Sequence, residues 1–173
     1  MTPPPACPLD PLVPGTRAVE LVAALTSRGQ TMATAESLTG GLLAATVAGV
    51  PGASVVLRGG LIVYATDLKA TLAGVDPDLL AADGPVAGRT AAGLARGAQT
   101  RCGADWGVGL TGVAGPDEQD GHAVGTVYLG IAGPDGIGVI DLALPGDRWA
   151  VRAAAVDAAV SGLLARLDVG VPR

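Results

Sequence analysis

The sequence predicts an α/β protein: a three-layer α/β/α sandwich with a mixed β-sheet, folded as a single domain. Three observations support this class. Helix-like and strand-like segments alternate through the earlier part of the chain, which is typical of parallel strands joined by helices. Two strand-like segments joined by a tight turn follow near the end, which is typical of an antiparallel hairpin. The length of 173 residues is that of one domain.

The first elements are expected where apolar periods end at a glycine or a proline. Residues 16–28 have an apolar helical face and stop at Gly29. A short strand over residues 31–34 follows, and a helix of small residues over 42–50 ends before Pro51.

The next segment, residues 54–64, is β-branched and aliphatic, so it predicts a strand. The pair Gly59 and Gly60 inside it predicts a bend or a bulge. Thr66 is placed to cap a short helix over 67–72. The remaining elements, in chain order, are helices 76–80 and 87–101, strand 106–110, strands 126–131 and 138–144 around the turn 133–136, and helix 148–167 with Asp147 as its cap.

Composition excludes several classes of function. Residues 1–14 are rich in proline and are expected to be a disordered leader before a domain over 15–170. The leader has no apolar core of a signal peptide, and no segment approaches the ~18 consecutive apolar residues of a membrane span. We therefore expect a cytoplasmic protein without membrane contact. A net charge of −5 argues against nucleic-acid binding, which needs a basic face.

Metal and cofactor sites are not expected. The two cysteines, Cys7 and Cys102, lie far apart, and His122 is the only histidine, so a Cys/His zinc site cannot be assembled. We expect both thiols to be reduced. An anionic ligand would have to be held by a few cations or by backbone N–H groups.

Ser37 lies in the segment Thr34–Gly41, which joins a predicted strand to a predicted helix. A hydroxyl beside backbone N–H groups at a helix N-terminus suits an anion or a developing oxyanion. Ser37 is either a cap or turn serine or a nucleophile on a strand-to-helix turn. The segment does not match the Gly-x-Ser-x-Gly elbow of hydrolases, and His122 lies in an acidic loop, so a nucleophile here would need a lysine as its base.

Lys69 is the only lysine among eleven cations. Coding bias toward arginine explains this as well as a chemical need does, because an amine can act as a base and a guanidinium cannot. Lys69 is expected near the third position of its short helix, where the helix dipole lowers its pKa and Asp67 raises it. Tyr64 could relay a proton or be an ordinary half-buried strand residue.

Two further places could hold an anion. The loop Thr111–Pro116 could cradle a phosphate with its N–H groups, or simply connect two strands. Arg148 and Arg152 are spaced i, i+4 at the start of the last helix, where cations are misplaced unless an anion binds or Asp147 neutralises one of them. Arg58, beside Gly59, is another candidate contact.

Taken together, the motifs resemble the C-terminal domain of the CinA family, the nicotinamide mononucleotide deamidases. The resemblance covers residues 16–167. It rests on six segments in order: Ala35–Gly41, Val50–Ser54, Arg58–Gly60, Tyr64–Lys69, Thr111–Pro116 and Val124–Val127. It implies a three-layer fold and an amidase without metal or cofactor, acting in pyridine-nucleotide salvage. The substrate would be nicotinamide mononucleotide, the products nicotinic acid mononucleotide and ammonia, and the assembly a homodimer or a higher homo-oligomer.

The resemblance also assigns roles to residues. Ser37 would be the nucleophile, Lys69 its base and Tyr64 an assisting group. The expected substrate contacts are Glu36, Thr39, Gly40, Gly41, Arg58, Gly59, Thr111, Gly112, Ala114, Gly115, and Arg148 or Arg152 at the phosphate.

The sequence departs from the family pattern at several places: Leu38 replaces a usual cysteine, Ala65 and Thr66 replace Ser-Asn, Ala87 replaces a serine, and residues 117–121 replace a glycine pair. A non-catalytic pyridine-nucleotide-binding module is therefore the alternative. A structural or partner-binding subunit is a third possibility.

Overall fold

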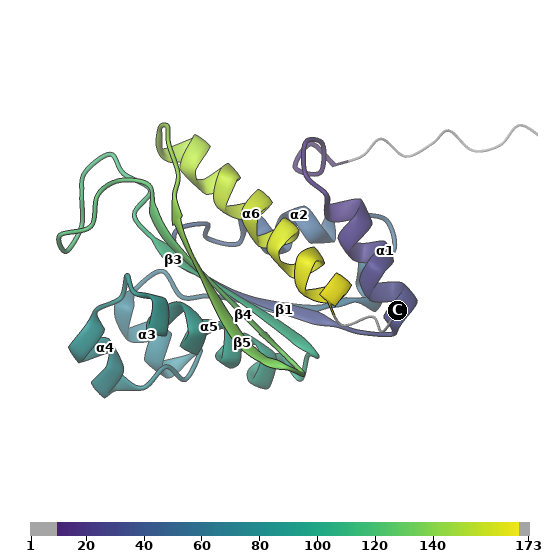
Figure 1. The fold of residues 1–173 in the computed structure, drawn as a ribbon, viewed down its shortest axis with the longest axis horizontal. Helices are drawn as coiled ribbons and strands as arrows, with labels where there is room; N and C mark the ends of the chain where they lie inside the picture. Colours follow the sequence, from purple (N-terminus) through teal and green to yellow (C-terminus); the bar gives the residue numbers. More distant parts are fainter. Residues whose placement is uncertain (1–9, 170–173) are drawn as a thin grey trace, which may run out of the picture.

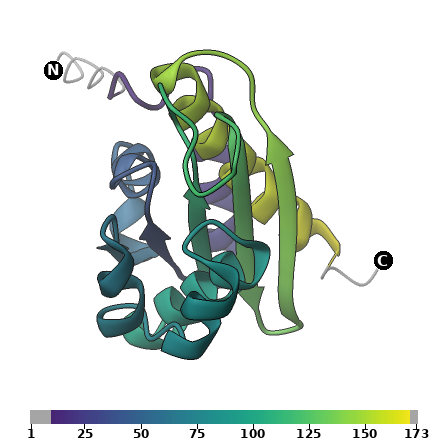
Figure 2. The same ribbon diagram turned by 90° about the vertical axis from the view of Figure 1, so that its left-hand side faces the viewer.

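A five-stranded mixed sheet forms the middle layer of the molecule (Figure 1). The computed structural model describes residues 10–169. The strand order is β2-β1-β3-β4-β5, with β1 parallel to β2 and β3, and antiparallel pairs β3–β4 and β4–β5. The turned view shows β5 at the outer edge (Figure 2). The strands are β1 (Met32–Glu36), β2 (Leu57–Ile62), β3 (Trp106–Gly112), β4 (Thr126–Gly133) and β5 (Gly136–Ala143).

Helices cover both faces of this sheet, which confirms the predicted α/β/α sandwich (Figure 1). One face carries α1 (Ala18–Arg28), α2 (Leu42–Ala48) and α6 (Arg148–Val169). The other carries α3 (Thr66–Thr71), α4 (Pro77–Asp83) and α5 (Gly88–Cys102), and a single 3₁₀ turn, Ala53–Val55, precedes β2. The larger core cluster joins the first face to the sheet through buried aliphatic residues such as Leu21, Leu43, Leu129 and Leu163.

Glycines let α5 approach the backbone of β3 and β4 closely. A Cβ atom added at Gly109 would lie 2.5 Å from Ala91 O, and one added at Gly130 would lie 2.3 Å from the same oxygen. Neither position tolerates a side chain without a shift of the helix. This close packing holds the segment before α5 against the end of β3, where Thr111 Oγ1 donates to Pro85 O at 2.6 Å.

Most predicted element ends agree with the structure. Gly29 adopts the left-handed conformation (φ 62°) after α1, and Asp147 accepts from Ala150 N at 2.9 Å at the start of α6. The bulge in β2 falls at Arg58, because Met32 pairs with Leu57 and the next residue of β1 pairs with Gly59.

Three predicted ends were wrong. The strand predicted over 54–64 begins only at Leu57, because Ala53–Val55 form a 3₁₀ turn. Thr66 does not cap α3: it is the first residue of that helix, and the preceding Ala65 provides no side-chain cap. The helix predicted over 76–80 runs from Pro77 to Asp83: Asp76 caps its start, and it ends at Gly84, whose positive φ (81°) stops it.

The predicted leader over residues 1–14 lies mostly outside the described residues. The described part of the leader, residues 10–14, consists mainly of turns. Val13 in this part is only 2% exposed and belongs to the main core cluster. Residue 170 of the predicted domain is also outside the description. Within residues 10–169, no helix combines the length and the apolar character needed to cross a membrane.

Candidate active site

Ser37 directly follows β1, at the carboxyl end of an interior strand of the sheet. Its N–H donates to Leu110 O at 2.9 Å, and its carbonyl accepts from Gly40 N at 3.0 Å, which closes a tight turn. Gly40 (φ 59°) and Gly41 (φ 98°) have positive φ, a conformation that glycine adopts without strain. The turn therefore presents Ser37 beyond the carboxyl ends of the parallel strands, which is where open α/β sheets bind their ligands.

Glu36 anchors the helix that follows this turn. Its carboxylate is 1% exposed and accepts from Gly41 N (3.0 Å), Leu43 N (3.0 Å), Ala44 N (2.9 Å) and the hydroxyl of Thr34 (3.1 Å). The expectation that Glu36 contacts the substrate is corrected, since both carboxylate oxygens bind the protein. The same carboxylate occupies the N–H groups of Gly41, Leu43 and Ala44 at the start of α2. In the described chain, the free N–H groups expected in the segment Thr34–Gly41 are therefore those of the turn before the helix, at Leu38 and Thr39.

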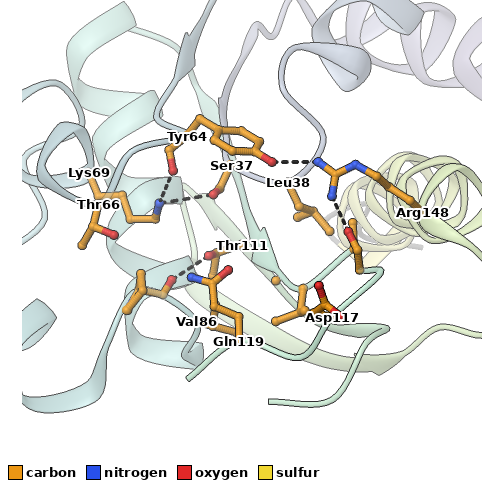
Figure 3. Close-up of a pocket in the computed structure, with 15 residues that line it drawn as sticks. Ser37, Leu38, Tyr64, Thr66, Lys69, Val86, Thr111, Asp117, Gln119 and Arg148 are labelled. Carbon is orange, nitrogen blue, oxygen red and sulfur yellow. Dashed lines mark hydrogen bonds between the residues drawn. The ribbon is translucent and has the colours of Figure 1, made fainter. Parts of the chain in front are cut away.

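Lys69 reaches Ser37 from α3. Its Nζ lies 3.2 Å from Ser37 Oγ and donates to Tyr64 O at 3.4 Å (Figure 3). It also donates to Val63 O at 2.9 Å. The side chain is 1% exposed, and this burial lowers the pKa of its ammonium, while the charge of Asp67 opposes the shift. The predicted cause was different: Lys69 lies in the last turn of α3, where a helix dipole does not favour the neutral amine.

The three partners of Lys69 Nζ are neutral oxygen atoms. As an ammonium, Lys69 donates its three N–H groups to Val63 O, Tyr64 O and Ser37 Oγ. As a neutral amine, it donates two N–H groups to the carbonyls and its lone pair accepts from the Ser37 hydroxyl. Within residues 10–169, no carboxylate forms an ion pair with Lys69. Nothing in its immediate contacts therefore fixes the amine in its charged form.

Ser37 and Lys69 lie in the wall of a pocket of about 110 Å³ (Figure 3). This volume is smaller than the ~300–1,000 Å³ of sites that enclose a whole cofactor. The pocket therefore fits the reacting end of a small molecule. The other residues that line it are Leu38, Tyr64, Thr66, Pro85, Val86, Thr111, Gly112, Val113, Ala114, Gly115, Asp117, Gln119 and Arg148.

The two arginines at the start of α6 have different surroundings. Arg148 lines the pocket and donates to Gly115 O (2.6 Å) and to the hydroxyl of Tyr64 (2.7 Å), so no carboxylate in the described chain neutralises it. Arg152 does not line the pocket; it donates to Leu38 O (3.0 Å) and Thr39 O (2.9 Å). Only Arg148 is therefore placed to meet an anion in the pocket.

Tyr64 lines the pocket as expected, but its hydroxyl binds Arg148, and the side chain is 57% exposed at the mouth. Its backbone carbonyl accepts from Lys69. Tyr64 therefore links the amine of Lys69 to the guanidinium of Arg148 and has no hydrogen bond to Ser37 in the described chain.

The structure separates Arg58 and Gly59 from the pocket. In the parallel pairing of β1 with β2, Arg58 lies beside Met32 at the start of β1, whereas Ser37 follows its end. Arg58 donates to Cys102 O at 3.0 Å. The prediction that Arg58 and Gly59 contact the substrate is therefore wrong, because neither residue lines the pocket.

The remaining predicted contacts fall into two groups. Thr111, Gly112, Ala114 and Gly115 line the pocket, whereas Thr39, Gly40 and Gly41 do not. Thr39 is fully buried, and its hydroxyl has no hydrogen-bond partner in the described chain.

Sequence reasoning missed several lining residues. Pro85 and Val86 precede the long helix α5, and only the packing of that helix on β3 places them here. Asp117 and Gln119 belong to the acidic loop over residues 117–121, to which the sequence assigned no site role. In the residues that the structure describes, no cluster of three or more His, Cys, Asp and Glu side chains could hold a metal ion.

Comparison with known proteins gives matches over most of the chain. The family model described as the CinA C-terminal domain matches residues 16–167. A CinA-like protein of Frankia casuarinae is 50% identical over 148 residues, which are 86% of this chain and 34% of that protein. A CinA-like protein of Acidobacterium capsulatum is 41% identical over 144 residues, covering 83% and 35%. The chain thus spans about a third of the length of these curated relatives.

Solved structures agree in fold. Competence/damage inducible protein CihA of Agrobacterium tumefaciens superposes with a TM-score of 0.83 at 32% identity, covering 87% of this chain and 93% of that one. Competence damage-inducible protein A of Klebsiella pneumoniae gives 0.84 at 28% identity, covering 89% and 99%.

Proposed function

The chain belongs to the CinA C-terminal domain family, and on that premise we propose that it is an amidohydrolase that converts nicotinamide mononucleotide into nicotinic acid mononucleotide and ammonia. One observation carries the proposal: the buried amine of Lys69 lies 3.2 Å from Ser37 Oγ in the wall of the pocket. A hydroxyl paired with a desolvated amine is the arrangement that activates a serine nucleophile without histidine.

In the first half of the proposed reaction, Ser37 Oγ attacks the carboxamide carbon while its proton passes to Lys69 Nζ. A tetrahedral intermediate with a negatively charged oxygen forms. The resulting Lys69 ammonium then gives its proton to the amide nitrogen, the C–N bond breaks and ammonia leaves. The pyridine carbonyl group remains on Ser37 as an ester.

In the second half, water replaces ammonia. Lys69, neutral again, takes a proton from the water, whose oxygen attacks the ester carbon. The proton then returns to Ser37 Oγ as the C–O bond breaks, and the pyridine carboxylate is released. Each proton in this route has a donor and an acceptor among Ser37, Lys69, the substrate and water.

Backbone N–H groups are available for the negatively charged oxygen. In the described chain, the N–H groups of Leu38 and Thr39 donate to no protein acceptor, and the same holds for Ala114 and Gly115 across the pocket. Leu38 immediately follows the nucleophile, which is where hydrolases commonly place an oxyanion donor. The N–H of Gly40, a residue expected to contact the substrate, is taken by Ser37 O.

Arg148 supports a substrate that carries a phosphate. Its guanidinium lies in the pocket wall and binds only neutral acceptors, Gly115 O and the Tyr64 hydroxyl. A phosphate at the pocket mouth could therefore form charge-assisted hydrogen bonds with it. The pocket would hold the carboxamide and its ring, and the ribose phosphate would extend toward α6.

The proposal is tested by ammonia release from nicotinamide mononucleotide, nicotinamide riboside and nicotinamide, using the purified protein and its Ser37→Ala variant. We expect turnover of the mononucleotide that Ser37→Ala abolishes and that a control, Ser27→Ala at an exposed position of α1, leaves unchanged. Saturable binding of the mononucleotide without ammonia release would instead favour the non-catalytic binding module. Full activity of Ser37→Ala would refute the mechanism.

A further inference from the structure

Arg152 holds the turn that follows the nucleophile. It lies one helical turn after Arg148 in α6, and its guanidinium donates to the carbonyl oxygens of Leu38 (3.0 Å) and Thr39 (2.9 Å). These residues are 114 and 113 positions away in the sequence, so the contact joins two separate parts of the fold. A planar guanidinium can bind two neighbouring acceptors in a fixed geometry, which an ammonium cannot do.

Hydrogen bonds to the carbonyl oxygens of the turn fix the direction of the unpaired N–H groups of Leu38 and Thr39. In a trans peptide unit the C=O and the N–H point in opposite directions. The N–H of Leu38 shares its unit with Ser37 O, which accepts from Gly40 N, and the N–H of Thr39 shares its unit with Leu38 O, which accepts from Arg152. Each unpaired N–H is thus set by a hydrogen bond at the other end of its peptide unit.

The turn is also held where it enters α2. Glu36 binds the N–H groups of Gly41, Leu43 and Ala44, as described above. A carboxylate therefore fixes the helix start and a guanidinium fixes the residues just after Ser37. Because α2 has only seven residues, its own hydrogen bonds would not hold this geometry.

We propose that Arg152 is a positioning residue: it holds Thr39 O, and through that peptide unit the Gly40 N–H that binds Ser37 O, so that the unpaired N–H of Leu38 forms the oxyanion hole for Ser37. This inference rests on the proposed function. The simpler explanation is surface packing, because the guanidinium also lies 5.9 Å from the centre of the Trp149 ring. Packing alone would affect stability and not the chemical step, so the two explanations differ in what they predict.

The first test compares Arg152→Lys with a matched control, Arg166→Lys. Arg166 lies on the same helix but binds Asp135 and Gly136 at the turn between β4 and β5. For Arg152→Lys we expect kcat to fall about 100-fold with little change in KM, because a small misplacement of the oxyanion donor acts on the transition state. The control should keep both constants. Millimolar guanidinium should restore kcat to a folded Arg152→Ala variant, and failure to do so would overturn the role of the head group.

The second test is the rate at which a sulfonyl fluoride labels Ser37, measured by mass spectrometry. In this reaction the Ser37 Oγ–S bond forms, the S–F bond breaks, fluoride leaves and the hydroxyl proton passes to Lys69. Labelling needs the nucleophile and the oxyanion hole but not the nucleotide. We expect Arg152→Lys to slow it in parallel with kcat.

Wild-type rates of labelling and turnover in Arg152→Lys, or a loss confined to KM, would overturn the inference. The proposed substrate fails separately if wild-type Ser37 is labelled but releases no ammonia from the mononucleotide; the labelling rates then still decide the role of Arg152. Absence of both labelling and turnover in the wild type would overturn the function and the inference together.

Discussion

The clearest energetic prediction concerns Glu36, which the motif suggests as a substrate contact and the structure assigns to the start of α2. The substitution Glu36→Gln keeps the shape of the side chain but turns one acceptor oxygen into a donor. Oε2 accepts from two backbone N–H groups, those of Gly41 and Leu43, whereas Oε1 accepts from Ala44 N and the hydroxyl of Thr34.

The glutamine should adopt the orientation that leaves fewer donors unpaired. With its NH₂ in the place of Oε1, the Thr34 hydroxyl can rotate and accept, so only Ala44 N loses its partner. One unsatisfied buried donor costs about 1–3 kcal/mol. Loss of the negative charge at the start of α2 adds about 0.3–2 kcal/mol. We therefore expect Glu36→Gln to lower the free energy of unfolding by about 1.3–5 kcal/mol.

Equilibrium unfolding in urea, followed by far-UV circular dichroism, measures this loss. Glu20→Gln is the control, because Glu20 is an exposed carboxylate paired with Arg17 on α1, and its loss should leave the midpoint unchanged. A destabilisation of Glu36→Gln below about 1 kcal/mol at an unchanged slope would refute the structural role. A normal stability with a raised KM would return Glu36 to the substrate site.

Three further predictions concern the pocket. Because burial lowers the pKa of Lys69 and only its neutral form is a base, kcat/KM should rise with pH to a plateau, with a midpoint below 10.5. Asp67→Asn should move that midpoint lower, because the charge of Asp67 raises the Lys69 pKa. A profile that does not change with pH would contradict both expectations. Because burial lowers the Lys69 pKa in the folded state, the folded protein binds fewer protons than the unfolded chain at a pH between the folded and the unfolded pKa of Lys69, so the buried lysine costs stability at neutral pH. Lys69→Met should therefore raise the melting temperature at neutral pH, by about 2–4 °C for each kcal/mol of stability recovered. This gain should shrink as the pH approaches 10.5. Arg148→Gln should raise KM for nicotinamide mononucleotide about 10- to 100-fold and leave nicotinamide riboside unaffected, since only the first has a phosphate; equal effects on both would remove Arg148 from phosphate binding.

Much of the fold follows from local signals in the sequence. Gly29 and Asp147 mark helix ends, and the hairpin around residues 133–136 identifies the antiparallel side of the sheet. These features depend on neighbours in the chain, so a single sequence contains them. The pairing of Ser37 with Lys69 was anticipated by excluding other bases and by the resemblance. The structure adds the cause: β2 runs parallel to β1, so the residues that follow the two strands meet at the same end of the sheet, beyond the carboxyl ends of the strands.

The errors at the site have a common origin. Glu36 and Arg58 are charged residues in recognisable motifs, and their types alone suggest ligand contacts. Burial of Glu36 against the start of α2 and the register of β2 along β1 decide otherwise, and both are properties of the tertiary structure. Arg148 and Arg152 lie one helical turn apart, so spacing alone does not distinguish the one in the pocket wall from the one bound to Leu38 O and Thr39 O.

The most direct test of the central claim is the rate of ammonia release from saturating nicotinamide mononucleotide by Lys69→Met compared with the wild type. Methionine fills a similar volume but cannot accept a proton. If Lys69 activates Ser37, the wild type releases ammonia and the folded variant, still binding the nucleotide, is slower by about 1,000-fold or more. A variant within about tenfold of the wild-type rate would contradict the account, because general-base catalysis alone contributes at least ~100-fold.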